Sequence, residues 1–252
     1  MAKAKQPKSA PQASEEQSVD LSVVIPCYNE EAIIWGAVEE FHAALKELGR
    51  SFELIISENG SKDDTRAIAE KLSRVYPEVR AIHSDEPNYG KALRRGIKAA
   101  RGTYVLCEEI DLCDIDFHAR ALQILDAGQA DFIVGSKAHP DANDQRPLLR
   151  RTATQVINGM LRVLLGFQGT DTHGLKAFHR QRVLDTVDRC VVDKDLFASE
   201  LVIRAQRYKL KVSEIPITIE EKRPPSIHLF RRVPNVLKNM ARLVWVVRIR
   251  NR

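Results

Sequence analysis

Short apolar runs alternate with helical patterns along the first half of the chain. Each run is rich in β-branched residues and ends in a polar turn, and the next segment repeats its apolar residues at helical spacing. The runs predict strands at residues 21–25, 52–56, 79–83, 104–107 and 131–134. The helical patterns cover residues 31–49, 63–76, 91–101 and 117–127. This alternation predicts an α/β fold with a Rossmann-like, doubly wound and mostly parallel sheet.

The second half of the chain contains fewer strand signals. Arg150, Thr154 and Asn158 recur every four residues, which places them on one face of a predicted helix. A further helix is predicted at residues 197–207 and a strand at residues 212–217. The proline inside that strand favours an edge position, because proline cannot donate a hydrogen bond to a neighbouring strand.

The charge is unevenly distributed along the chain. The 252 residues carry a net charge of +5, and their 44% apolar and 29% charged content suits one large domain with appendages. From Lys222 to the end there are nine Lys/Arg and no Asp/Glu, while the rest holds 30 basic residues against all 34 acidic ones. Residues 1–19 have too few apolar side chains to fold, so we expect them to be disordered. The basic end predicts an anionic partner, either a membrane or a nucleic acid.

The last segment, residues 229–249, has the pattern of a basic amphipathic helix. Its apolar residues fill one arc of the helical wheel, basic residues fill the opposite arc, and Trp245 lies near the boundary. Such helices suit the surface of an anionic membrane, where each basic group contributes roughly 1 kcal/mol. The alternative is a helix docked on the protein's own sheet. Nucleic acid is disfavoured, because no aromatic stacking platform accompanies the charge.

The cysteines and the apolar runs indicate a cytosolic protein. The four cysteines form no CxxC pair and no zinc-binding spacing, which is typical of reduced thiols. No window approaches the roughly 18–20 consecutive apolar residues of a membrane span. The N-terminus also lacks the apolar core of a signal peptide.

Three carboxylates follow the predicted strand 104–107. Glu108, Glu109 and Asp111 would each cost several kcal/mol to bury without partners, so we expect them at the exposed end of the strand. Glu109 and Asp111 can share a divalent cation, most naturally Mg²⁺ or Mn²⁺, whereas Glu108 points to the opposite face and is expected to take no part. The alternative is a solvated strand terminus without a ligand.

Other polar motifs end the neighbouring strands. Residues 28–30, 58–61 and 88–91 follow the first three predicted strands as residues 109–111 follow the fourth. Ligands of doubly wound sheets bind at the carboxyl ends of the strands. This convergence favours one shared site over a set of unrelated loops, although residues 88–91 can also be read as a plain turn before a helix.

Three of these motifs carry a resemblance to a known family. Val-Ile-Pro-Cys-Tyr-Asn-Glu at 24–30, Glu-Asn-Gly-Ser-Lys-Asp-Asp-Thr at 58–65 and Glu-Ile-Asp at 109–111 resemble the family 2 glycosyltransferases of GT-A fold. Within that family the chain is most similar to the polyprenol- and dolichol-phosphate mannosyltransferase branch. The resemblance covers residues 20–226 and implies a GT-A domain there, between the disordered residues 1–19 and a membrane-surface element at residues 227–252.

The resemblance implies a nucleotide-binding half of the site. Its residues are Pro26, Tyr28, Glu30, Glu58, Asn59 and Lys91, and the metal would be held by Glu109 and Asp111. The chain departs from the family at Glu58–Asn59, where an Asp pair is usual, and at Glu109, which replaces the first Asp of the DxD-type motif. Cys113 stands where related synthases often have a Gln ligand, so Asp114 or water is expected to complete the coordination.

The resemblance also implies an acceptor half. Lys137 and Arg150 lie in motifs near the acceptor phosphate, as does Lys176 in the sequence Asp171-Thr-His-Gly-Leu-Lys176. Asp171 and Arg223 are implied to be catalytic, Arg223 in a basic loop over the diphosphate. The alternatives are a solvated helix start for Arg150 and a proline-stiffened linker for the loop around Arg223.

The implied activity is inverting transfer of a sugar from a nucleotide-diphosphate sugar to a polyprenyl phosphate, at the cytosolic face of the membrane. A phosphate acceptor is already ionised, so this reaction needs no strong general base. A second hypothesis is transfer to a soluble or saccharide hydroxyl, which requires a base such as Asp171 or Glu200. A third is a catalytically weak homologue that binds nucleotide sugars or membranes.

Overall fold

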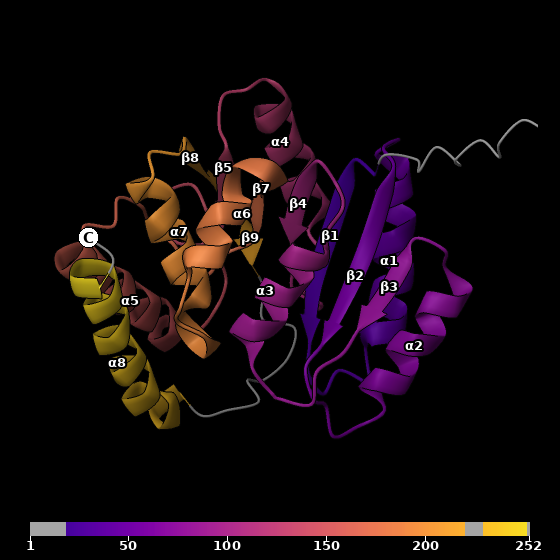
Figure 1. The fold of residues 1–252 in the computed structure, drawn as a ribbon, viewed down its shortest axis with the longest axis horizontal. Coiled ribbons are helices and arrows are strands. Elements are labelled where there is room, and N and C mark those ends of the chain that lie inside the picture. The colour runs from indigo at the N-terminus through magenta and orange to yellow at the C-terminus, as the bar shows by residue number, and fades with distance from the viewer. Residues whose placement is uncertain (1–18, 220–228, 251–252) are drawn as a thin grey trace, which may run out of the picture.

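A mixed seven-stranded sheet forms the centre of the protein in the computed structural model, which describes residues 19–219 and 229–250 (Figure 1). The strand order is β3-β2-β1-β4-β7-β5-β8, and β7 runs antiparallel to both of its neighbours. The strands are β1 Leu21–Cys27, β2 Phe52–Glu58, β3 Val79–Ile82, β4 Tyr104–Cys107, β5 Phe132–Ser136, β7 Lys176–His179 and β8 Val212–Pro216. Two short strands, β6 Asn143–Asp144 and β9 Thr218–Ile219, pair separately.

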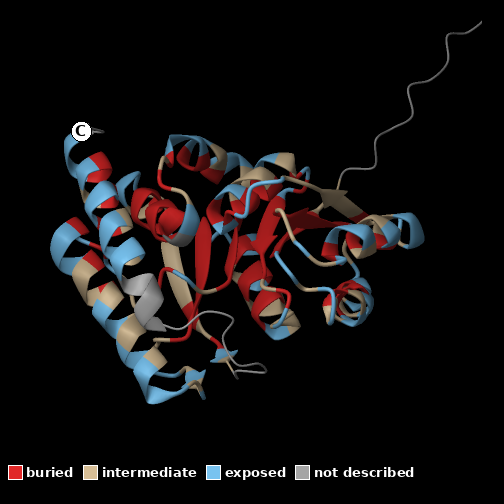
Figure 2. Ribbon diagram, turned by 90° about the horizontal axis from the view of Figure 1, so that it is seen from below, coloured by how far each residue is buried: buried red, intermediate tan, exposed pale blue. Residues whose placement is uncertain are grey.

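Eight α-helices of the described chain pack around the sheet (Figures 1 and 2). They are α1 Ile34–Glu47, α2 Thr65–Val75, α3 Tyr89–Ala99, α4 Ile115–Asp126, α5 Leu148–Leu165, α6 Arg180–Arg189, α7 Phe197–Arg207 and α8 Leu229–Trp245. A 3₁₀ turn, η1 Lys194–Leu196, precedes α7, and a π-helical turn, η2 Val246–Arg250, continues α8. The five strands and four helices predicted in the first half are confirmed, with ends that shift by a few residues.

The strands alternate between two hydrophobic layers. Val23 and Ile25 of β1 face the cluster that α1, α2 and α4 cover, and Val24 faces the cluster that α3, α5, α6 and α7 cover. Each fully buried Val, Leu, Ile or Phe side chain contributes roughly 1.5–3 kcal/mol to folding. Burial on both faces therefore stabilises the sheet, and the loops that can bind a ligand lie at the ends of its strands.

The sequence pattern predicts a first strand that ends at residue 25, before Pro26, but β1 continues through Pro26 to Cys27. The Val24 carbonyl accepts from the Glu108 amide on the β4 side, and position 26 would present its amide on that same side. The pairing of β1 with β4 ends at Val24 and Cys107. No ladder partner is lost there, so a proline is tolerated in a central strand.

The sequence pattern missed β7. This strand lies between β4 and β5, with Cys107 beside Lys176 and Val134 beside Lys176 on the other side. The expectation of an edge position for the strand at residues 212–217 is confirmed, because β8 ends the sheet.

Helix α8 docks on the body of the protein. Met240, Leu243 and Val247 are buried in the same cluster as residues of α5 and α7, so this segment packs on neighbouring helices of the protein. Leu237 and Trp245 remain about half exposed. None of the described helices is both long and apolar enough to cross a bilayer.

Candidate active site

The acidic pair lies in the loop after β4. Glu109 is half-buried and Asp111 is exposed, as expected for the end of a strand. Burial, together with the charges of Asp111 and Glu108, raises the pKa of Glu109 to about 7, although a hydrogen bond from Tyr89 opposes the rise. A carboxylate held in this way is only partly ionised at neutral pH, and a cation beside it would favour the charged form.

Glu108 does not lie at the exposed end of the strand, and it is not a bystander. It is buried and accepts hydrogen bonds from the amides of Glu109 at 2.8 Å and Asp114 at 3.0 Å. His118 Nε2, on the buried face of α4, lies 2.7 Å from Oε2, the oxygen that also accepts from the Asp114 amide. These partners offset the cost of burying the charge, so Glu108 shapes the loop that presents Glu109 and Asp111.

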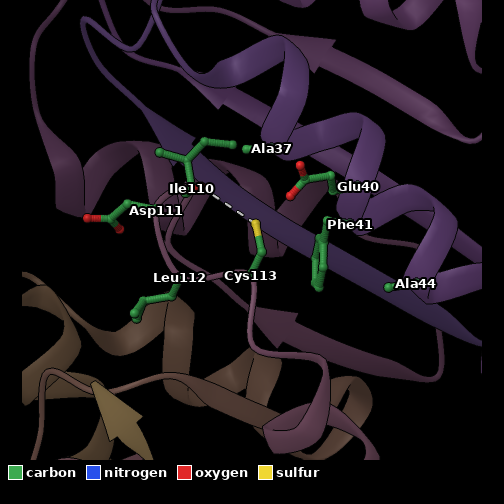
Figure 3. A pocket seen from close by; sticks show the side chains of 8 residues that line it. All are labelled: Ala37, Glu40, Phe41, Ala44, Ile110, Asp111, Leu112 and Cys113. Carbon is green, nitrogen blue, oxygen red and sulfur yellow. Dashed lines mark hydrogen bonds between the residues drawn. The ribbon is translucent and has the colours of Figure 1, made fainter. Parts of the chain in front are cut away.

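Neither Cys113 nor Asp114 completes a metal site. Figure 3 shows the Cys113 sulfur turned toward Phe41 in a small hollow between α1 and the loop after β4, whereas the Asp111 carboxylate points away from that sulfur. Asp114 caps α4 by accepting from the Phe117 amide at 2.9 Å. The described residues contain no group of three or more His, Cys, Asp or Glu side chains placed to hold a metal ion. Two carboxylates fit a cation that takes its remaining ligands from a diphosphate and water.

Tyr89 extends the acidic site to helix α3. Its hydroxyl donates to Glu109 Oε1 at 2.5 Å from the first turn of the helix, where Asn88 provides the cap. Gly90 lets the start of α3 pack closely against η1 and α7, because a Cβ at that position would lie 2.7 Å from Phe197 Cβ and 2.9 Å from the Lys194 amide nitrogen. Apart from its place in the turn at residues 88–91, no sequence feature pointed to Tyr89.

Replacing Tyr89 by Phe should weaken Mn²⁺ binding at neutral pH. The hydrogen bond from Tyr89 favours the ionised form of Glu109, so its loss raises the pKa of that carboxyl further and lets protons compete better with the cation. Mn²⁺ titrations followed by calorimetry should show a several-fold loss for Tyr89→Phe near pH 7 and recovery about one to two pH units higher. Equal affinities of both proteins at neutral pH would contradict this role.

Two motifs of the predicted nucleotide side interlock. The Asn29 amide donates to Ser61 Oγ at 3.0 Å, and the Lys62 amide donates back to Asn29 Oδ1 at 2.8 Å. The Glu30 amide donates to Thr65 Oγ1 at 2.7 Å. Asn29 adopts a left-handed conformation to make this turn. The turn after β1 and the turn after β2 therefore form one rigid edge.

The predicted nucleotide-binding residues differ in how exposed they are and in which hydrogen bonds or ion pairs they already form. Tyr28 is exposed, whereas Glu58 is buried and accepts from the Ser61 amide at 2.6 Å. Asn59 donates to the Cys27 carbonyl at 2.8 Å and accepts from the Asn88 amide at 3.0 Å, so it joins three loops. Lys91 forms an ion pair with Glu86 at 2.6 Å on the surface. Pro26 lies inside β1, as described above.

A buried ion pair defines the predicted acceptor side. Lys137 Nζ lies 2.7 Å from Asp171 Oδ2, and the two side chains are 9% and 0% exposed. Burial opposes ionisation of Asp171, but the Lys137 ammonium and the His173 amide lower its pKa to about 2. The turn that carries Asp171 packs against β5 at Gly174. Any side chain there would clash, because an added Cβ would lie 1.7 Å from the Gly135 carbonyl oxygen.

Strand β7 joins the two halves of the site. Lys176 begins this strand and donates to the Gly174 carbonyl at 2.6 Å. Burial lowers its pKa, while the thiol of Cys107 and the charges of Asp171 and Glu109 oppose the shift. Lys176 therefore lies within electrostatic reach of both the acidic pair and the buried ion pair.

The remaining predicted residues belong to neither the acidic pair nor the buried ion pair. Arg150 lies in the first turn of α5, whose Asn158 donates to the Thr170 carbonyl at 2.6 Å beside Asp171. Glu200, the other candidate base, is buried and accepts from Arg204 and from the amides of Val191 and Val192. Arg223 lies outside the described residues.

A mixed sheet with an acidic pair after a central strand is the arrangement of GT-A glycosyltransferases. The family model described as glycosyl transferase family 2 matches residues 22–187. The chain belongs to this family, which confirms the resemblance seen in its motifs.

Relatives and solved structures agree with this assignment. The chain is 30% identical to the glycosyltransferase AglD of Haloferax volcanii over 96% of its own length and 40% of that protein. It is 27% identical to the dolichyl-phosphate beta-glucosyltransferase of Saccharomyces cerevisiae, over 82% of this chain and 69% of that protein. Glucosyl-3-phosphoglycerate synthase from Mycobacterium tuberculosis, solved with Mn²⁺, UDP-glucose and phosphoglyceric acid, shares the fold with a TM-score of 0.64 at 18% identity, over 90% and 80% of the two chains. The chain thus spans less than half of the Haloferax relative.

Proposed function

We propose that this chain transfers a sugar, with inversion, from a nucleotide-diphosphate sugar to a polyprenyl phosphate at the cytosolic face of a membrane. The name of the yeast relative, a dolichyl-phosphate glucosyltransferase, supports a lipid phosphate as acceptor. The observation that carries the acceptor class is the state of the two candidate bases. Asp171 is paired with Lys137 and has a pKa of about 2, and Glu200 is enclosed by Arg204 and two backbone amides.

A carboxylate with a pKa of about 2 is a poor proton acceptor for a sugar hydroxyl. A phosphate monoester brings its own negative oxygen and needs positive charge to hold it instead. Lys137 and Lys176 provide buried positive charge at the same sheet edge as the acidic pair, and Arg150 lies in the first turn of α5. The site therefore favours an ionised acceptor over a neutral hydroxyl.

The donor half is proposed to hold the nucleotide between Tyr28, Glu30, Glu58 and the turn at Lys91, with Pro26 and Asn59 fixing the loops. Mg²⁺ or Mn²⁺ on Glu109 and Asp111 would neutralise the charge that develops on the leaving diphosphate. We assign Arg223 to the diphosphate as well, on its motif position alone. Residues 229–249 would hold the protein on an anionic membrane surface.

A panel of radiolabelled sugar nucleotides tests this function. The purified protein is given Mn²⁺ or Mg²⁺ and either a polyprenyl phosphate or soluble saccharide acceptors, and chelator is added to a parallel sample. We expect label in the organic-extractable lipid with one donor, and its loss with chelator. Label found only in water-soluble product would favour the hydroxyl-acceptor hypothesis. No turnover with any donor would favour a binding homologue.

A further inference from the structure

Helix α5 carries an apolar stripe that faces solvent. Leu149, Val156 and Val163 recur every seven residues, which aligns them along one side of the helix, and they are 55%, 56% and 80% exposed. Leu148 at the start of the helix is 76% exposed. A helix of a water-soluble domain normally turns such residues to its core. Here the core face is formed by other residues, Leu161 and Leu165.

Helix α8 and turn η2 carry a second stripe. Leu237, Trp245 and Ile249 follow the four-residue spacing of one helix ridge and are 50%, 51% and 66% exposed. With the residues of α5, these segments hold eight of the twelve large hydrophobic residues that are exposed in the described chain. Exposed apolar residues scattered singly need no explanation, but their concentration on two elements does.

The two helices form one platform. Figures 1 and 2 both place α5 and α8 side by side at one end of the molecule. Leu161 of α5 and Leu243 of α8 belong to the same buried cluster. Arg207 ties their ends together, since it donates to the Leu165 carbonyl at 3.3 Å and to the Val247 carbonyl at 2.8 Å.

The platform is basic as well as apolar. The segments α5, α8 and η2 contain nine Lys/Arg and no Asp/Glu, in a chain that has 34 acidic residues. A protein partner could use either charge or apolar surface. Exposed apolar stripes on segments whose charged residues are all basic fit the headgroup and acyl boundary of an anionic bilayer.

We propose that α5 is a second membrane-docking helix and that α5 and α8 together form a two-helix face for anionic lipid. This inference rests on the proposed function, and it adds a reason why the face lies where it does. Asn158, two residues after Val156 and on the opposite side of α5, donates to the Thr170 carbonyl beside Asp171. One side of α5 thus meets lipid while the other supports the acceptor side of the site, so a phosphate in the headgroup layer reaches the protein without leaving the membrane.

Vesicle sedimentation tests the two-helix face on the full chain. Val156→Glu/Val163→Glu on α5 and Leu237→Glu/Trp245→Glu on α8 should each weaken binding to phosphatidylcholine vesicles containing phosphatidylglycerol by about tenfold or more. Val75→Glu is the matched control, because Val75 is 51% exposed on α2, and it should bind like the unchanged protein. Vesicles of phosphatidylcholine alone should bind the unchanged protein less tightly.

Unchanged vesicle binding by the α5 variant would overturn the proposal. A concentration-dependent dimer that the α5 variant dissociates, with no vesicle binding, would assign the face to a second copy of the chain and also overturn it. Val156→Ser/Val163→Ser repeats the test without new charge, and thermal melts show that each variant is folded. The vesicles contain no polyprenyl phosphate, so a wrong acceptor assignment would leave their binding unaffected. If transfer occurs, the α5 variant should keep it with a short, water-soluble prenyl phosphate.

Discussion

Replacing Glu109 by Gln should lower sugar transfer by about a thousandfold or more and make the protein more stable above neutral pH. The amide keeps the shape of the side chain, and it can still accept the hydrogen bond from Tyr89. The neutral amide lacks the negatively charged oxygen that would bind a cation held between this side chain and the diphosphate. Initial rates at saturating donor and Mn²⁺ measure the first effect, and Asp111→Asn should show a similar loss.

The expected gain in stability follows from the pKa of Glu109. Burial raises it from 4.5 to about 7, so the charged form is less favourable in the folded protein than in the unfolded chain. The penalty is absent well below pH 4.5 and fully present above about pH 7, where it amounts to roughly 3 kcal/mol. Melting curves should therefore show Glu109→Gln more stable than the unchanged protein at about pH 8 and equal to it at about pH 4.

A nearby carboxylate provides the control for Glu109. Glu40 on α1 lines the hollow next to the loop but makes no contact with Tyr89 among those the structure describes. Glu40→Gln should retain full transfer and show no gain in stability at high pH. If Glu109→Gln retained transfer within about tenfold of the unchanged protein, its assignment as a metal ligand would be wrong.

The fold was largely predictable because its strands and helices have regular patterns. Val23, Val24 and Ile25 form a continuous apolar run, as expected for a strand buried on both faces. Strand β7 escaped prediction because Lys-Ala-Phe-His is short and opens with a buried lysine. Its antiparallel insertion depends on contacts with β4 and β5, which are far away in sequence, so no local pattern reveals it.

The grouping of the turns that form the candidate site was predictable, whereas the hydrogen-bond partners of its side chains were not. The polar residues at the strand ends correctly predicted that the turns after β1, β2 and β4 lie together, because parallel strands end at one edge of the sheet. The partners of individual groups depend on distant residues. Glu108 is satisfied by His118, ten residues later, and Asn59 is satisfied by Cys27 and Asn88. Only the role of Asp114 had a local signal, since an Asp before a helical pattern is a typical N-cap.

Replacing Asp171 by Asn should lower the free energy of unfolding by about 3 kcal/mol or more, because it leaves the buried Lys137 without its counter-charge. The pair is 2.7 Å apart, and both side chains are almost fully shielded from water. Chemical denaturation at neutral pH measures the effect. Asp188→Asn is the matched control, since the Lys98–Asp188 pair has the same distance but both side chains are about half exposed. It should cost at most about 1 kcal/mol.

The pH dependence of stability gives an independent measure of the same pair. Asp171 ionises at about pH 2 in the fold, against its ordinary value of 3.8, so the ion pair contributes fully above about pH 4. Roughly 2 kcal/mol of stability should disappear as the pH falls from about 4 to 2. Asp171→Asn has no carboxyl there, so the gap between its stability and that of the unchanged protein should narrow by that amount over the same window.

A double variant separates the structural role of the pair from its role with the acceptor. Lys137→Met/Asp171→Leu removes both charges together, so it should recover most of the stability that Asp171→Asn loses. Sugar transfer should stay low in the double variant, because Lys137 no longer supplies positive charge for an acceptor phosphate. Recovery of both stability and transfer would show that the pair only holds the turn at Gly174 in place. Recovery of stability alone would show that Lys137 also acts on the acceptor.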